Sequence, residues 1–244
     1  SRKTYSETAV IYSVESNFLR ATGRGLFADN RYNLSTSEVG PFWQVCEALS
    51  NLSQPYDVVF FPDGDLREDT LADEDLSGYH TLVLPDCHFL TQAQARLLVS
   101  YLESGGRLVV LGDLGANLPE ETRLAHLEHA STTWNPDPDG FDPSLLPSGL
   151  QASLTPAADL AINVQRVARG AAVHLIRYDY DNAQDSLPAL PELDLELRLP
   201  VAFGKVEVFS PGGELAASLE VSGPVHRLSL RDVPLYSILL LHEG

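Results

Sequence analysis

The clearest pattern of apolar and polar positions lies in Tyr79–Asp113. Two short, mainly apolar runs, Thr81–Leu84 and Arg107–Leu111, flank a segment whose leucines recur at helical spacing. That helix should begin after Thr91, because Thr91 and Gln94 match a capping box. Strand, helix and strand within about 30 residues predict a right-handed βαβ unit. The continuous apolar runs predict parallel strands that are buried on both faces.

A similar alternation precedes this unit. Thr8–Tyr12 reads as a first strand that ends in Ser13–Asn17, and a polar loop with Arg20, Gly23, Arg24 and Gly25 is expected after it. Pro41 should open a helix, because proline suits the first helical position, and Tyr56–Phe61 reads as the next strand. Strands that alternate with helices indicate a doubly wound, mostly parallel sheet. We therefore predict an α/β domain over residues 1–130.

The pattern changes from Leu154 onward. Short strands follow one another with no helical segment between them, and Leu193–Leu199 alternates strictly as LDLELRL. Turn signals rich in proline and glycine separate these strands. This pattern of short strands and turns predicts an all-β antiparallel sandwich over residues 154–244. The intervening residues 131–153 are rich in Pro, Asp, Ser and Gly, and we expect a linker or long surface loop there.

Charge and composition restrict the classes of partner. A formal net charge of -18 argues against nucleic acid and anionic membranes, since both are bound through Lys and Arg. No apolar run is long enough to span a bilayer, and no signal peptide is visible, so a cytoplasmic location is favoured. The chain does not begin with Met, and we expect a piece of a longer polypeptide or a processed form. Two cysteines make neither a disulfide framework nor a zinc motif, and no metal or cofactor is predicted.

The ends of the predicted strands gather acidic residues. Ligands of such sheets bind beyond the carboxyl ends of the strands, so these side chains are candidate ligand-binding residues. They are Glu15, Asp63, Asp86 and Asp113. Together they could hold a divalent cation or hydrogen-bond the hydroxyls of a sugar. Alternatively they serve as helix caps and turn residues.

The sequence predicts no catalytic residues. The candidate side chains for such a role are Cys87, His88 and Asp113. Cys87 and His88 resemble a nucleophile beside its base, but consecutive residues seldom point at one another. The alternatives are a partly buried thiol beside a surface imidazole, or a hydrolase that pairs Cys87 with a distant base such as His126.

Three further motifs were weighed. Asn135–Gly140 matches the first half of a calcium loop, but the twelfth position is Leu146 instead of Glu. His126 and His129 could share a helix face, although no further metal ligands accompany them. The chain has no GxGxxG after its first strand, no phosphate-binding loop and no GxSxG elbow.

Both halves of the chain show a family resemblance. The first domain resembles the glutamine amidotransferase-like domain attached to certain glycoside hydrolases, including the trimerisation domain of bacterial β-galactosidases. The later part resembles the β-rich segment that follows such domains. The matching stretches are Ala9–Ser16, Pro55–Val59, Asp75–Tyr79, Leu82–Asp86, Glu103–Val110, Ala172–Tyr180, Lys205–Pro211 and Tyr236–Leu240.

The resemblance implies a flavodoxin-like, class I glutamine amidotransferase-like sheet followed by a C-terminal sandwich. True amidotransferases carry a Cys in a G-x-C-x-G turn after the strand that corresponds to Arg107–Leu111. Here that turn is Gly112–Gly115, and neither Asp113 nor Leu114 can supply a thiolate. Cys87 follows the preceding strand, and the His-x-Glu pair that orients the base is not evident.

We therefore expect a non-catalytic accessory or assembly region of a β-galactosidase-like glycoside hydrolase. In the resembling enzymes, catalysis belongs to a separate TIM barrel of roughly 250 residues, for which this chain has no room. The expected partners are a second copy of the chain or a TIM-barrel glycosidase domain, with carbohydrate as a possible ligand. The alternatives are a carbohydrate- or cation-binding protein that uses the acidic edge, and a Cys87-dependent hydrolase of the same fold.

Overall fold

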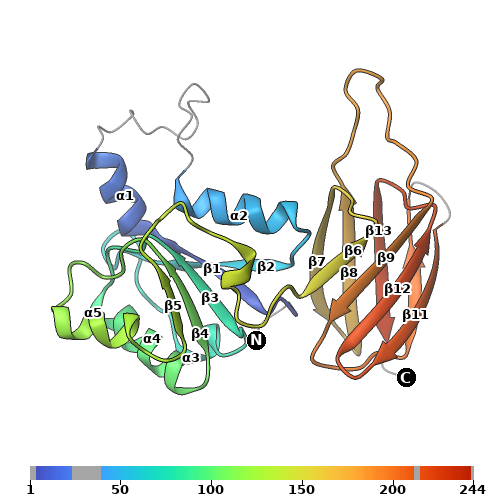
Figure 1. Ribbon diagram of the computed structural model, residues 1–244. Helices are drawn as coiled ribbons and strands as arrows, with labels where there is room; N and C mark the ends of the chain where they lie inside the picture. The colour runs from blue at the N-terminus through green and yellow to red at the C-terminus, as the bar shows by residue number, and fades with distance from the viewer. Residues whose placement is uncertain (1–3, 24–39, 212–214, 243–244) are drawn as a thin grey trace. The chain divides into compact units, whose positions relative to one another are not determined.

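A computed structural model describes residues 4–23, 40–211 and 215–242 of the chain. It divides into two compact units (Figure 1). The first comprises mainly Glu7–Ala48 and Asp57–Gly149, and the second the described residues of Arg2–Ser6, Leu49–Tyr56 and Leu150–Gly244. No helix in the described part of the chain is both long and apolar enough to cross a bilayer.

The first unit is built on a five-stranded sheet in the order β2-β1-β3-β4-β5. Its strands are β1 (Thr8–Ser13), β2 (Tyr56–Phe61), β3 (Thr81–Pro85), β4 (Arg107–Leu111) and β5 (Thr132–Asn135). The pairs β1–β3, β3–β4 and β4–β5 are parallel. Every residue of β3 is buried, as the continuous apolar run predicts for a strand covered on both faces.

Helices lie on both faces of this sheet, α1 and α2 on one side and α3, α4 and α5 on the other (Figure 1). They are α1 (Val14–Gly23), α2 (Pro41–Asn51), α3 (Asp73–Leu76), α4 (Gln92–Glu103) and α5 (Glu120–Leu127), with the 3-10 helix η1 (Pro143–Leu145) near the end of the unit. The capping box predicted for α4 is present, since Thr91 Oγ1 accepts the N–H of Gln94 and Gln94 Oε1 accepts the N–H of Thr91. The predicted α/β architecture is therefore confirmed.

Two segments differ locally from the expectation. The strand end and the first part of the predicted polar loop form helix α1 (Val14–Gly23), whereas Arg24 and Gly25 of that loop lie outside the described residues. Ser13 Oγ accepts the N–H of Ser16 at 3.3 Å, the contact by which a serine caps a helix, so the serine that ends the strand also starts the helix. The predicted linker, residues 131–153, contains β5 and the first two residues of β6.

The second unit is a sandwich of two four-stranded antiparallel sheets, as the alternating pattern predicts. One sheet has the order β10-β13-β8-β7 and the other β11-β12-β9-β6. The strands are β6 (Ala152–Thr155), β7 (Leu160–Val167), β8 (Gly170–Arg177), β9 (Glu192–Arg198), β10 (Lys205–Phe209), β11 (Ala216–Ser222), β12 (Val225–Arg231) and β13 (Tyr236–His242). In β9 every second residue, from Leu193 to Leu197, is buried, so its acidic residues lie on the outer face of the sheet.

Candidate functional site

The parallel sheet changes winding direction between β1 and β3, which is where ligands of such sheets bind. In this chain, residues that follow β1 and β3 contact one another at this point. The hydroxyls of Ser13 and Ser16 lie 2.7 Å apart, and both lie within 3.3 Å of the carbonyl oxygen of Phe89. Ser16 Oγ also accepts the N–H of Phe89 at 3.0 Å. Both serines are at most 3% exposed, so their hydroxyls are used within the fold and are not open to a ligand.

The turns after β3 and β4 bring three of the predicted residues together. Asp86 adopts a left-handed backbone (φ 49°), and its Oδ1 accepts the N–H of Asp113 at 3.2 Å. His88 Nδ1 lies 3.9 Å from Asp86 Oδ2, and Asp113 Oδ1 lies 3.6 Å from Arg123 Nη1. The imidazole of His88 therefore faces a carboxylate, and the contacts of Asp86 serve mainly to join the two turns.

Cys87 does not sit in a catalytic environment. Its side chain is 1% exposed and belongs to the hydrophobic core of the first unit, with Sγ 3.9 Å from the carbonyl oxygen of Pro85. Burial among apolar side chains disfavours the thiolate that a nucleophile requires. The distant base considered from the sequence is also occupied, because His126 Nδ1 and Nε2 lie 2.7 and 2.9 Å from the carbonyl oxygens of Thr122 and Ala95. His126 thus joins α5 to α4 and has no ring nitrogen to offer a thiol.

The turn after β4 is tightly packed at Gly112 and Leu114. Gly112 has φ +67°, and a Cβ there would lie 2.7 Å from Asp86 Oδ1. Leu114 is 1% exposed and packs into the core, whereas Asp113 is exposed. The carbonyl oxygen of Gly112 accepts the indole N–H of Trp134 at 2.9 Å. The turn is thus fixed from both sides by hydrogen bonds and by packing.

The other two predicted ligand-binding residues do not join this group into a cation site. Asp63 Oδ1 accepts the backbone N–H groups of Asp65, Leu66 and Arg67 at 3.0–3.2 Å. These bonds, that to Arg67 first, lower the pKa of Asp63 below its ordinary value, and the carboxylate caps its own turn. Glu15 lies in the first turn of α1 and is partly exposed. Among the described residues, no three His, Cys, Asp or Glu side chains are grouped so that they could hold a metal ion.

The segment that resembles half a calcium loop also uses its oxygens internally. Asn135 Oδ1 accepts the N–H of Asp137, and Asp137 Oδ1 accepts the N–H of Asp139, each at 3.0 Å. Asn135 Nδ2 donates to the carbonyl oxygen of Gly140. These are the contacts of successive Asx turns, so the segment is a self-contained bend after β5.

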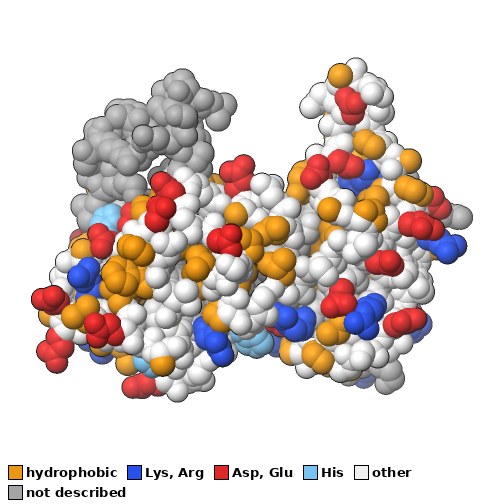
Figure 2. All heavy atoms as spheres, viewed as in Figure 1, with side chains coloured by type: hydrophobic (Ala, Val, Ile, Leu, Met, Phe, Trp, Pro, Cys, Tyr) orange, Lys and Arg blue, Asp and Glu red, His pale blue; other side chains and the backbone are white. Residues whose placement is uncertain are grey.

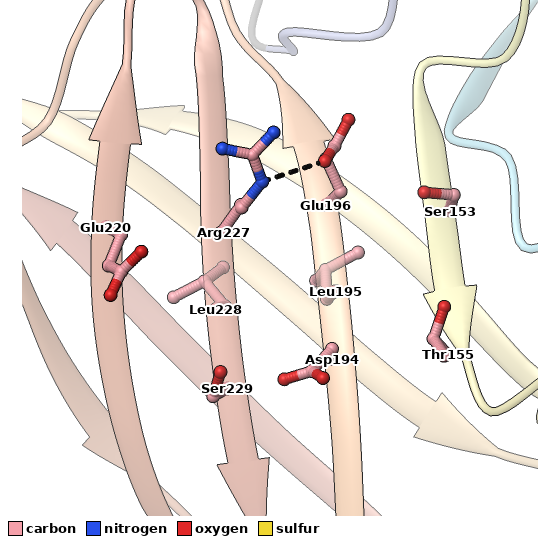
Figure 3. Close-up of a pocket in the computed structure, with 9 residues that line it drawn as sticks. All are labelled: Ser153, Thr155, Asp194, Leu195, Glu196, Glu220, Arg227, Leu228 and Ser229. Carbon is pink, nitrogen blue, oxygen red and sulfur yellow. Dashed lines mark hydrogen bonds and ion pairs between the residues drawn. The ribbon is translucent and has the colours of Figure 1, made fainter.

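A second candidate site lies on the outer face of the sheet β11-β12-β9-β6, where the side chains form a hollow of about 360 Å³ (Figure 3). We call it the polar hollow. It is lined by Ser153, Thr155, Asp194, Leu195, Glu196, Glu220, Arg227, Leu228 and Ser229. The strand register places Arg227 between Glu196 and Glu220, and Asp194 between Thr155 and Ser229.

The polar hollow combines charged and hydroxyl groups on the outer face of the sheet. Arg227 Nε donates to Glu196 Oε2 at 3.0 Å, and the remainder of the guanidinium points away from that carboxylate (Figure 3). Leu195 and Leu228 are at most 1% exposed and belong to the sandwich core, so they border the hollow from the opposite side of the sheet. The sequence alone does not reveal this site. The strict alternation of β9 indicates which acidic residues point outward, but it does not show which side chains lie beside them on the neighbouring strands.

Comparison with known proteins shows where a similar fold occurs. No protein-family model matches the chain, and neither does any curated protein. Solved structures do match it along its whole length. An α-L-fucosidase isoenzyme from Paenibacillus thiaminolyticus is 12% identical with a TM-score of 0.61, the match covering 99% of this chain and 49% of that one.

Two further solved structures have a TM-score of 0.55. A rhamnosidase from Novosphingobium sp. PP1Y is 13% identical over 100% of this chain and 23% of its own. A β-galactosidase from Bacillus circulans sp. alkalophilus is 9% identical over 99% of this chain and 42% of its own. The chain therefore spans about half or less of these enzymes. At such low identity the likeness concerns the fold alone, and this two-unit fold is one that occurs within glycoside hydrolase chains.

Proposed function

We propose that this chain is a non-catalytic accessory and assembly region of a glycoside hydrolase. The observation that carries the proposal is the match of both units together, over 99–100% of this chain, to a part of three glycosidase chains. Each of those chains has at least as many residues again outside the matched part, in which a catalytic domain could lie.

Among the described residues of the α/β unit, no acyl-transfer site is assembled, which supports a non-catalytic role. The strand order β2-β1-β3-β4-β5 is that of flavodoxin-like sheets, and the resemblance to amidotransferase-like domains rests on this order and on the matching stretches of sequence. In such a domain the nucleophile would follow β4, where this chain has Gly112–Gly115. Cys87 is buried and His126 is bound to two carbonyl oxygens, so neither replaces the missing pair.

An exposed aromatic patch on the first unit supports a role in assembly. Tyr12, Phe42, Trp43 and Phe60 form a chain of ring contacts with centroids 4.9–5.5 Å apart. Trp43 and Phe60 remain 44% and 46% exposed, although aromatic rings of this kind are usually covered. Aromatic side chains are enriched at protein interfaces, and β2, which carries Phe60, is an edge strand of the sheet. We propose that a second copy of the chain covers this patch.

The first test is the oligomeric state, measured by light scattering behind size exclusion over a concentration series. A stable dimer or trimer is expected. Trp43→Ser should weaken it, whereas Leu66→Ser, which removes a 90% exposed leucine outside the patch, should not. A chain that stays monomeric at every concentration contradicts self-assembly, and binding to a TIM-barrel glycosidase domain instead would identify that domain as the partner.

The second test concerns catalysis by the chain. Purified protein should neither hydrolyse glutamine nor release nitrophenol from nitrophenyl glycosides. Robust turnover that disappears in Cys87→Ser or Asp113→Asn would contradict the non-catalytic role and favour the hydrolase alternative.

A further inference from the structure

The polar hollow has hydrogen-bonding groups that the protein does not use. Within residues 4–23, 40–211 and 215–242, the carboxylates of Asp194 and Glu220 make no hydrogen bond or ion pair. The same holds for the hydroxyls of Ser153, Thr155 and Ser229 in that part of the chain. Arg227 uses only its Nε on Glu196, which leaves the donors of both Nη atoms available.

These groups are arranged in two rows across the sheet. One row runs Ser153, Glu196, Arg227, Glu220, and the other runs Thr155, Asp194, Ser229. Neighbours within a row are separated by roughly 5 Å, and the rows by two residues along a strand, or roughly 7 Å. Donors and acceptors therefore alternate over an area of roughly 15 by 7 Å on the outer face of the sheet (Figure 3).

The charges restrict the class of ligand. Three carboxylates against one guanidinium disfavour an anion. A metal ion is disfavoured as well, since the described residues contain no suitably grouped set of three ligands. A neutral molecule with several adjacent hydroxyls fits both constraints. Each hydroxyl can donate to a carboxylate and accept from Arg227 or a serine, and hydrogen bonds to ionised groups are the stronger kind.

We propose that the polar hollow binds a single neutral sugar ring of a glycoside. Its volume of about 360 Å³ lies at the lower end of the range for small-molecule sites. The hollow is open and has no aromatic ring to stack on the sugar, so the dissociation constant should be on the order of 1 mM. The choice of ligand rests on the proposed function, because it takes the sugar class from the glycosidases that share this fold.

The test is an NMR titration of the full chain, labelled with nitrogen-15, using methyl β-galactoside and methyl α-fucoside in separate arms. Amide shifts should concentrate in β6, β9, β11 and β12 and saturate in the millimolar range. Asp194→Asn removes the central carboxylate of the second row and should weaken binding roughly tenfold. Glu192→Gln is the matched control, because Glu192 lies on the same strand and the same face but outside the hollow. It should bind as the unchanged chain does.

Three results would overturn the inference. They are no saturable shift with either glycoside, shifts that lie outside the four strands, and equal affinity in Asp194→Asn and the unchanged chain. A parallel titration with calcium chloride tests whether the polar hollow binds a cation instead. Saturable shifts at Asp194 with calcium but not with sugar would assign the hollow to a cation. Failure here leaves the assembly role standing, because that role is measured by oligomeric state and not by sugar binding.

Discussion

His226 should make the stability of the sandwich depend on pH. Its side chain is fully buried, Nε2 accepts the N–H of Phe203 at 3.0 Å, and Nδ1 lies 3.2 Å from the carbonyl oxygen of Pro224. This geometry requires the neutral ring with the proton on Nδ1. Burial lowers the pKa of His226 below its ordinary value of 6.5, and hydrogen bonds to backbone groups at Pro224 and Leu197 oppose part of that effect.

The sign and size of the effect follow from proton linkage. Because the pKa is lower in the folded chain, the unfolded chain binds more protons between the lowered pKa and 6.5. The contribution of His226 is therefore complete above 6.5 and is lost as the pH falls through that window. One proton can change the free energy of unfolding by at most about 1.4 kcal/mol per pH unit. At neutral pH, removing the ring would leave the N–H of Phe203 unsatisfied, at a cost of about 1–3 kcal/mol, in addition to lost packing.

The assay compares urea unfolding of the unchanged chain and His226→Gln between pH 7.5 and 5. Trp43 and Trp134 both lie in the first unit, so their fluorescence follows that unit, whereas circular dichroism in the β region also follows the sandwich. The unchanged chain should be the more stable at pH 7.5, and the difference should shrink below 6.5. His80→Gln makes the same replacement in the first unit and should leave the sandwich transition unchanged. A difference that stays constant across the pH range would refute the reasoning.

Three further predictions follow from single contacts. Gly170→Ala would place a Cβ 2.1 Å from the carbonyl oxygen of Leu241. Overpacking of this kind should lower the free energy of unfolding by about 1–3 kcal/mol and therefore lower the melting temperature. An unchanged melting temperature would contradict the tight approach of β8 and β13. Cys87 should react with iodoacetamide only after unfolding, as followed by mass spectrometry, because it is 1% exposed; rapid labelling of the folded chain would argue against a core thiol. Arg177→Met should destabilise the sandwich by about 1–3 kcal/mol, because the buried guanidinium donates to backbone carbonyls as well as to Asp179. Arg177 lowers the pKa of Asp179 mainly through a hydrogen bond. The part of the lost stability that is due to the Arg177–Asp179 pair should therefore be present above pH 3.8, the ordinary pKa, and should disappear as the pH falls through the lowered pKa. If Arg177→Met lowers stability equally at all pH values, the Arg177–Asp179 pair does not contribute.

The sequence predicted the elements whose local signals agree with their surroundings. The capping box at Thr91 and the buried run at Thr81 specify the βαβ unit, because local preference and tertiary burial favour the same structure there. Strand β5 was missed because Thr132–Asn135 is short and lies in a segment rich in turn residues. It forms a strand through pairing with β4, and such distant pairing leaves little trace in local sequence. The sequence does not reveal helix α1, because a serine such as Ser13 occurs in turns as well as in helix caps.

The candidate site was predictable only to the level of the sheet edge. Strand order determines that the ends of β3 and β4 are neighbours, which brings Asp86 close to Asp113. What the carboxylates do there depends on backbone groups a few residues away. Asp63, for example, is used by three N–H groups of its own turn, and no spacing rule separates such a cap from a ligand. The polar hollow required knowledge of the register across four strands, which the sequence of any one strand does not contain.

The proposed non-catalytic role rests on more than one residue of the turn after β4. A thiol in place of Leu114 would lie in the core, where its thiolate is disfavoured. A thiol in place of Asp113 would be exposed, but the side chain that faces that position is Arg123, whose guanidinium carries only donors and offers no acceptor for the thiol proton. Asp86, which in this chain bonds the backbone N–H of residue 113, holds the turn closed against β3. If the proposed correspondence with amidotransferase-like domains holds, both the position of the nucleophile and its base differ here, and the contacts of Asp86 and Leu114 stabilise the fold at this edge.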